Sequence, residues 1–177
     1  REGEVIVGTL AGLRGVKNLP RLVRAVATLP GHVRLVIVGE GPEREAIVAE
    51  AARAGMTDRL VLPGFMGQPH QFVGLFDIFA LSSDSEQFPI SLVEAMAAGL
   101  PAVSTDVGDV LSIVADENRR FVVPVTDEAG YAQALATLVA DADLRAKVGQ
   151  ANRTKAVAQY DEASMISAYA QLYGLPA

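Results

Sequence analysis

Short β-branched runs alternate with longer amphipathic stretches along this chain of 177 residues. Such alternation is typical of βαβ units, in which helices cover both faces of a mostly parallel sheet. We therefore predict one α/β domain over residues 1–177, with three α/β/α layers and a helical C-terminal tail. The predicted strands are Glu4–Leu10, Val33–Val38, Leu60–Leu62, Ile78–Ser82, Ala102–Ser104 and Phe121–Val123.

The predicted helices lie between these strands and continue through the tail. Gly55 and Gly99 stand where a helix C-terminus favours a left-handed residue, and Pro101 prevents continuation of the second helix. The tail is predicted to be helical from Asp127 to Tyr173, with breaks near Asp141 and Tyr160–Asp161, and its last helix has an apolar face that needs a partner surface. The other predicted helices are Leu19–Thr28, Pro42–Ala54, Pro69–Leu75, Ile90–Ala98 and Val110–Val114.

Composition excludes several classes of protein. A net charge of −6 argues against a nucleic-acid-binding surface, and the absence of cysteine excludes disulfides and thiolate metal sites. No apolar run reaches the roughly 18–20 residues that span a bilayer, so no transmembrane segment is predicted. Because the chain starts at Arg1 without a methionine, we expect it to be a piece of a longer polypeptide.

Two carboxylates frame a predicted helix start. Pro89 suits the first helical turn, and the backbone N–H groups of Ile90 to Leu92 would then be free to face an anion such as a diphosphate. Glu86 precedes these donors and Glu94 lies more than a turn inside the helix, where carboxylates could accept bonds from sugar hydroxyls. The alternative is that both glutamates are solvated residues with no ligand.

Two glycine-bearing loops follow the first two predicted strands. In Val36–Pro42 (VIVGEGP), Gly39 and Gly41 allow close approach of a ligand to the backbone, although such glycines also serve the turn alone. In Thr9–Asn18 (TLAGLRGVKN), Arg14 and Lys17 could clamp a diphosphate, or could simply be solvated. Both loops are expected at the carboxyl edge of the sheet.

Other chemistries find little support. Ser82, Ser83 and Ser85 lack the G-x-S-x-G context of a nucleophile, which disfavours a hydrolase. His32 and His70 have no second ligand at metal-binding spacing, so no metal site is predicted.

The residues resemble the large retaining glycosyltransferase group of the GT-B fold that includes glycogen and sucrose synthases, the family 4 type. The similarity covers nearly the whole chain in order: VGTLAGLRGVKN, VIVGEGPER, LPGF, FDIFALSSDSEQFPISLVEAMAAGLPAVSTDVGD and AYAQLY. In the two-domain enzymes of this group these motifs belong to the C-terminal, donor-binding domain. The resemblance therefore implies a Rossmann-like domain that binds a nucleotide sugar, with the N-terminal acceptor-binding domain absent.

The resemblance also implies roles for individual residues. Lys17 matches the lysine on the donor diphosphate, Glu94 matches the glutamate on the ribose hydroxyls, and Glu86 matches the glutamate that faces the donor sugar. We assign Glu86 and Lys17 as catalytic. The donor-binding residues are then Arg14, Lys17, Gly39, Gly41, Glu86, Gln87, Phe88, Pro89, Ile90, Ser91, Leu92 and Glu94.

Two positions depart from the pattern of this group. Gly12 stands where an arginine is usual, about five residues before the lysine, and Gln87 stands where a glycine is usual. The first departure favours an alternative, a non-catalytic regulatory or scaffold domain. A nucleotide-sugar epimerase is a further alternative.

The resemblance sets further expectations for the full protein. It implies transfer with retention from a UDP- or GDP-sugar, with the departing diphosphate stabilised by Lys17 and the helix start and with neither metal nor cofactor. The isolated chain should bind donor but transfer poorly. We expect a cytoplasmic protein that contacts no nucleic acid, and the resemblance leaves room for peripheral membrane contact.

Overall fold

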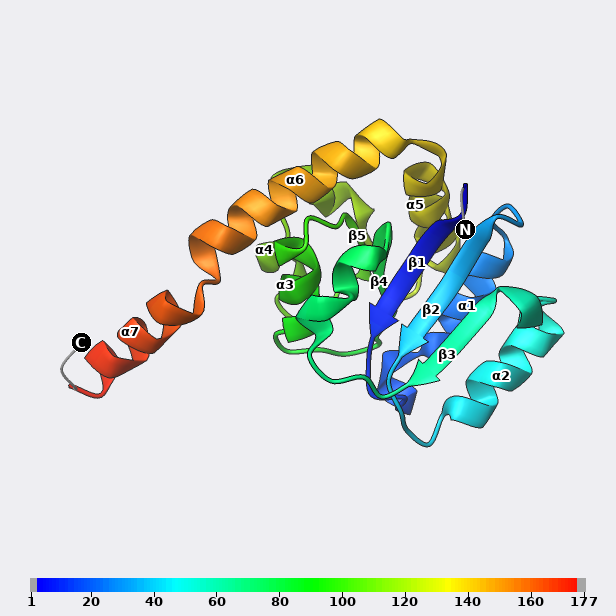
Figure 1. Cartoon of the computed structure of the whole chain (residues 1–177), viewed down its shortest axis with the longest axis horizontal. Coiled ribbons are helices and arrows are strands. Elements are labelled where there is room, and N and C mark those ends of the chain that lie inside the picture. The colour runs from blue at the N-terminus through cyan, green and yellow to red at the C-terminus, as the bar shows by residue number, and fades with distance from the viewer. Residues whose placement is uncertain (1–2, 175–177) are drawn as a thin grey trace.

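The computed structural model describes residues 3–174 and contains a six-stranded, all-parallel sheet between two helical layers (Figure 1). The strand order is β3-β2-β1-β4-β5-β6. This confirms the predicted three-layer fold class. The strands are β1 (Val5–Leu10), β2 (Val33–Val38), β3 (Leu60–Gly64), β4 (Ile78–Leu81), β5 (Ala102–Thr105) and β6 (Val122–Val123).

Seven α-helices lie within the described residues and cover the sheet or extend from it. Their ends follow the expected glycine and acidic signals: Gly55 and Gly99 have positive φ, and Asp141 caps the helix that follows it. The helices are α1 (Leu19–Ala27), α2 (Arg44–Arg53), α3 (Ile90–Ala97), α4 (Val110–Ile113), α5 (Glu128–Ala140), α6 (Ala142–Gln159) and α7 (Glu162–Leu172).

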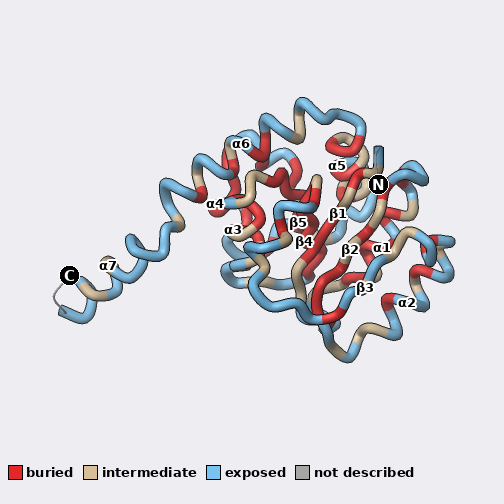
Figure 2. The backbone as a smooth tube through the Cα atoms, in the orientation of Figure 1, coloured by how far each residue is buried: buried red, intermediate tan, exposed pale blue. Residues whose placement is uncertain are grey.

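Each face of the sheet buries its own apolar core, which follows from the period of two along a strand. In β4, Ile78 and Ala80 join the core under α1, α2 and α5, whereas Phe79 and Leu81 join the core under α3 and α4. Figure 2 shows the central strands buried and the outer helix surfaces exposed.

Two segments differ from the sequence prediction. Pro69–Leu75 forms two 3-10 turns, Pro69–Gln71 and Val73–Leu75, and not one helix; Leu75 is exposed. The helix predicted from Pro42 begins at Arg44, because Pro42 and Glu43 remain in the turn that follows Gly41. Both deviations occur where glycine or proline interrupts the helical hydrogen-bond pattern.

The last helix stands away from the sheet. α7 has no buried residue, and Figures 1 and 2 show it extending from the end of α6 as an exposed arm. The apolar face that the sequence predicted has no partner surface among the described residues, and Met165, Ile166, Tyr169 and Leu172 are 49–76% exposed. Among residues 3–174, no helix is both long and apolar enough to cross a membrane.

Two fully buried asparagines join α6 to the edge of the sheet. The Asn118 amide bonds both the N–H and the carbonyl of Ala102 at 2.8 Å, and Asn152 Nδ2 donates to Asn118 Oδ1 at 2.8 Å. Asn152 also bonds the Leu100 carbonyl and the Ala115 N–H. This network fixes the segment between α3 and β5, and thereby the position of α3 against the sheet.

We predict that Asn118→Ala lowers the free energy of unfolding by on the order of 3 kcal/mol, because both backbone groups of Ala102 lose their buried partner. Urea unfolding followed by circular dichroism measures the change. Glu117→Ala, at an exposed neighbouring position, should leave stability within about 0.5 kcal/mol. Equal stability of the two variants would contradict the structural role of the network.

Candidate functional site

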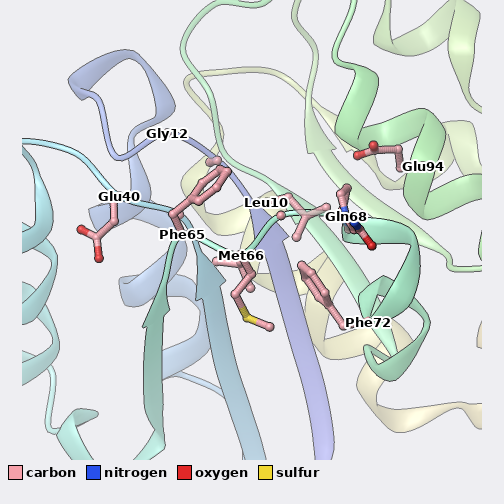
Figure 3. A pocket seen from close by; sticks show the side chains of 13 residues that line it. Leu10, Gly12, Glu40, Phe65, Met66, Gln68, Phe72 and Glu94 are labelled. Atoms are coloured by element: carbon pink, nitrogen blue, oxygen red, sulfur yellow. The ribbon is translucent and has the colours of Figure 1, made fainter.

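A cleft of about 470 Å³ opens at the carboxyl edge of the sheet. It lies beside the junction of β1 and β4, where the sheet reverses its winding direction and where open α/β sheets bind ligands. Its walls come from the segments that follow β1, β2 and β3, with α3 opposite them (Figure 3). Its lining includes Gly12, Gly39, Phe65, Met66, Phe72 and Glu94.

The cleft combines an apolar floor with a few polar groups. Phe65, Met66 and Phe72 present apolar surface to it, and Phe65 is 78% exposed although it is a large aromatic residue. Glu94 on α3 and Glu40 after β2 lie at opposite sides of this surface in Figure 3. A planar apolar group with hydroxyls on one side therefore matches this cleft.

Glu94 is partly shielded from water within this cleft. Burial raises the pKa of its carboxyl above the ordinary glutamate value, and the nearby His70 opposes the shift. The carboxylate has no hydrogen-bond partner among the described residues, so its oxygens are available to a ligand. The position agrees with the predicted role of Glu94 as an acceptor.

Lys17 and Glu86 meet next to the cleft. Lys17 Nζ lies 2.6 Å from Glu86 Oε1, across 69 positions of sequence, and only 26% and 11% of the two side chains are exposed. They line a small hollow together with Ser83 and Ser91, and this hollow shares Leu10 and Ala11 with the cleft. The structure therefore brings together the two residues that the sequence assigned as catalytic.

The turn that carries Lys17 is fastened to the loop that carries Glu86. The Ser82 hydroxyl donates to the Lys17 carbonyl at 2.9 Å, and the Asp84 N–H donates to the Val16 carbonyl at 2.8 Å. From α1, the buried Arg21 donates to the Ser82 carbonyl and pairs with Asp84 at 3.0 Å. Both loops are therefore held in place before any ligand arrives.

The first turn of α3 lies beside the same hollow, which Ser91 lines. Pro89 is the N-cap and no side chain caps the helix, so the N–H groups of Ile90 and Ser91 have no partner among the described residues. The expectation for Leu92 was wrong in one respect. Its N–H is not free but donates to the Pro89 carbonyl at 3.0 Å, and its side chain is fully buried in the core.

Arg14 lies beside the position that lacks the usual arginine. Its Nε would lie 3.7 Å from a Cβ placed on Gly12, and its side chain forms no ion pair among the described residues. The Arg14 side chain thus lies beside Gly12, which lines the cleft, although Arg14 itself does not line it.

The remaining predicted residues occupy different places around the site. Gly39 lines the cleft and Gly41 does not; a Cβ on either would overlap the Ala11 or the Leu13 carbonyl, so both keep two loops in contact. Gln87 and Phe88 are exposed in the loop before α3, and the Phe88 ring makes an edge contact with Tyr160, 5.8 Å between centroids.

Sequence reasoning missed the apolar part of the cleft. Phe65 and Met66 follow β3, and Phe72 lies in the segment predicted to be helical; none of the three was predicted as a site residue. The signal that could have found them is topological. Because β3 lies parallel beside β2, the loop after β3 begins at the same carboxyl edge of the sheet as the loop after β2. Within residues 3–174, no cluster of histidine, aspartate and glutamate could hold a metal ion.

The fold is that of a three-layer, Rossmann-like α/β domain with a cleft at the carboxyl edge of its sheet, and comparison with known proteins identifies its family. The family model described as glycosyl transferases group 1 matches residues 1–155, and the chain belongs to this family.

Curated relatives are similar along most of the chain. The N-acetyl-alpha-D-glucosaminyl L-malate synthase of Bacillus anthracis is 28% identical over 97% of this chain and 46% of its own length. The lipopolysaccharide core biosynthesis glycosyltransferase LpsE of Rhizobium meliloti (strain 1021) is 31% identical over 88% of this chain and 46% of its own length. The chain thus spans about half the length of these relatives.

Solved structures share the fold. HepE of Anabaena in complex with UDP has a TM-score of 0.90 at 22% identity, over 97% of this chain and 49% of that chain. The C-terminal domain of LpcC, a glycosyl transferase group 1 family protein from Francisella tularensis, has a TM-score of 0.79 at 21% identity. That match covers 89% of this chain and 87% of the LpcC domain.

Proposed function

We propose that this domain binds the nucleotide-sugar donor of a glycosyltransferase. The observation that carries the proposal is the contact between Lys17 and Glu86 at 2.6 Å, beside a cleft whose far wall holds Glu94. A cation, free helix N–H groups and two carboxylates thus follow one another along a single surface. This order matches a ligand with a diphosphate between two hydroxyl-bearing groups.

The cleft would hold the nucleoside. Phe65, Met66 and Phe72 offer apolar surface to a base, and the Glu94 carboxylate would accept hydrogen bonds from the ribose hydroxyls. Gly12 and Gly39 would permit close approach of the ligand to the backbone. Of the structural neighbours, HepE binds UDP, which supports a nucleoside diphosphate here; the donor is a UDP- or GDP-sugar.

The diphosphate would lie over the start of α3. The N–H groups of Ile90 and Ser91 and the positive end of the helix dipole would stabilise its charge, together with Lys17 and Arg14. In the free domain Lys17 Nζ donates a hydrogen bond to Glu86. When the donor is bound, the remaining N–H groups of Lys17 would donate to the phosphate. The charge of the departing diphosphate would thus be met by groups of the protein, without a metal.

Glu86 would orient the transferred sugar. Its carboxylate is fixed beside Lys17 and thus next to the phosphate that leaves, where a hydroxyl of the sugar could donate to it. We propose transfer with retention at the anomeric carbon, as the resemblance to the family 4 type implies, and we place the enzyme in the cytoplasm as a separate proposal. The backbone of Phe88 to Leu92 would surround the sugar and the diphosphate, as the resemblance implies.

A second domain would complete the enzyme. The curated relatives are about twice as long as this chain, and the proposal assigns acceptor binding to the N-terminal domain of a longer polypeptide. The exposed apolar face of α7 supports this proposal, since such a face is normally covered by other protein. The chain alone would bind donor and transfer poorly.

A non-catalytic scaffold is the second candidate, and Gly12 is the feature that favours it. The position of Arg14 weakens this candidate, because its Nε lies 3.7 Å from the position of a Cβ on Gly12 and so supplies a cation near the missing arginine. Donor binding decides between the two functions, since a scaffold that has lost the donor would not bind it.

We predict that Lys17→Ala and Glu94→Ala each weaken binding of the preferred nucleotide sugar by about 10- to 100-fold, because each removes a charged side chain of the protein that would hydrogen-bond the ligand. Calorimetry with UDP-glucose and GDP-mannose measures the affinity. Lys147→Ala, which removes an exposed lysine from α6, is the matched control and should bind as the parent does. If neither nucleotide sugar binds the parent chain, the proposed function is wrong.

We predict a pH dependence that belongs to Glu94. The pKa of Glu94 is raised, so when pH is lowered this carboxylate becomes protonated at a higher pH than an ordinary glutamate does. Since the ionised form is the better acceptor for ribose hydroxyls, affinity should decrease as pH falls through this raised pKa. Calorimetry across pH should show this decrease for the parent and not for Glu94→Gln; an identical profile for both would contradict the assignment.

A further inference from the structure

Ser83 is a buried serine next to the proposed sugar-binding carboxylate. It is 1% exposed, follows β4 by two residues, and its hydroxyl donates to Glu86 Oε1 at 2.6 Å. That length is typical of a hydroxyl bound to an ionised carboxylate, which is stronger than a bond between neutral groups. A nucleophilic role was disfavoured from sequence, and the structure gives this hydroxyl a different task.

The sheet holds Ser83 in place. Thr105, at the end of β5, is 1% exposed and donates through Oγ1 to the Ser83 carbonyl at 2.6 Å. The same strand is bonded to β4 through Phe79, Ala80 and Leu81. The Ser83 hydroxyl is therefore a fixed donor at the carboxyl edge of the sheet, and not a mobile surface group.

Glu86 has the opposite character. It stands in a loop after the strand, and a free glutamate side chain populates several rotamers, so that holding it in one of them costs entropy. Its Oε1 receives both Lys17 Nζ and Ser83 Oγ at 2.6 Å, whereas its Oε2 has no partner among the described residues. One oxygen is thus occupied by the protein and the other is available to a ligand.

We infer that Ser83 is a positioning residue that fixes the Glu86 carboxylate, so that Oε1 stays on Lys17 and Oε2 is presented to a hydroxyl of the donor sugar. The inference rests on the proposed function for the identity of the ligand. The Glu86 side chain is then pre-organised. It is already ordered before the sugar binds, so binding does not have to supply the free energy of ordering it.

The test compares a nucleotide sugar with the nucleoside diphosphate that lacks the sugar, in each variant. Ser83→Ala removes the hydroxyl, and Ser85→Ala makes the same change at an exposed serine two residues away with no bond to Glu86. Calorimetry uses UDP with UDP-glucose, or GDP with GDP-mannose if the chain prefers guanine. Ser83→Cys, close to serine in volume and a weak donor, replaces Ser83→Ala if that variant does not fold.

We expect Ser83→Ala to weaken nucleotide-sugar binding by about tenfold and to leave nucleoside diphosphate binding within about twofold. Ser85→Ala should match the parent for both ligands. In a Glu86→Ala background, which removes the acceptor of the Ser83 bond, Ser83→Ala should change the sugar-dependent affinity by less than about twofold, because both residues act through one carboxylate. Equal weakening for both ligands, or an undiminished effect in the Glu86→Ala background, would overturn the positioning role.

A crystal structure of the Ser83→Ala variant separates this inference from the proposed function. If the parent binds no nucleotide, the donor site is wrong, and the 2.6 Å contact between Lys17 Nζ and Glu86 Oε1 still reports on positioning. Loss of this contact in Ser83→Ala and its retention in Ser85→Ala would support the role of Ser83. An unchanged Glu86 side chain in Ser83→Ala would overturn it.

Discussion

The pairing of β1 with β4 is the constraint on which the site depends. These two strands lie side by side, with Val7 opposite Ile78 and Gly8 opposite Phe79, although β2 and β3 separate them in sequence. Gly8 makes the contact possible, because a Cβ there would overlap the ring of Phe76, which lies two residues before β4. The winding direction of the sheet reverses at this pair, and the cleft opens beside it.

The proposed ligand site follows from that pairing. The loops after β1 and β4 leave the same edge of the sheet, so Lys17 and Glu86 meet across 69 positions of sequence. Ser82, Asp84 and Arg21 fasten the two loops to each other, and α3 begins where the second loop ends. The charged groups are therefore ordered by the fold, which lowers the cost of arranging them around a ligand.

Periodicity and end signals were sufficient to predict the sheet, because strands buried on both faces read as apolar β-branched runs. Glu86, Glu94 and Lys17 could be predicted as a set through family resemblance, and the structure places them around adjoining hollows. The conformation of the segment from Pro69 to Leu75 could not be predicted from its apolar pattern, since proline and glycine interrupt the helix there. The apolar cleft and the bond from Ser83 to Glu86 depend on contacts between distant loops, which no local pattern encodes.

Amide chemical shifts of the ¹⁵N-labelled chain, recorded during titration with UDP and with GDP, test the central claim most directly. If the cleft holds a nucleoside diphosphate, one of the two ligands should shift the amides of Gly12, Gly39, Met66 and Ser91 and leave Gln133 and Thr137, on a separate groove along α5, unchanged. Shifts centred on the α5 groove, or no saturable shifts with either nucleotide, would contradict the claim that this domain is built to hold a nucleotide-sugar donor.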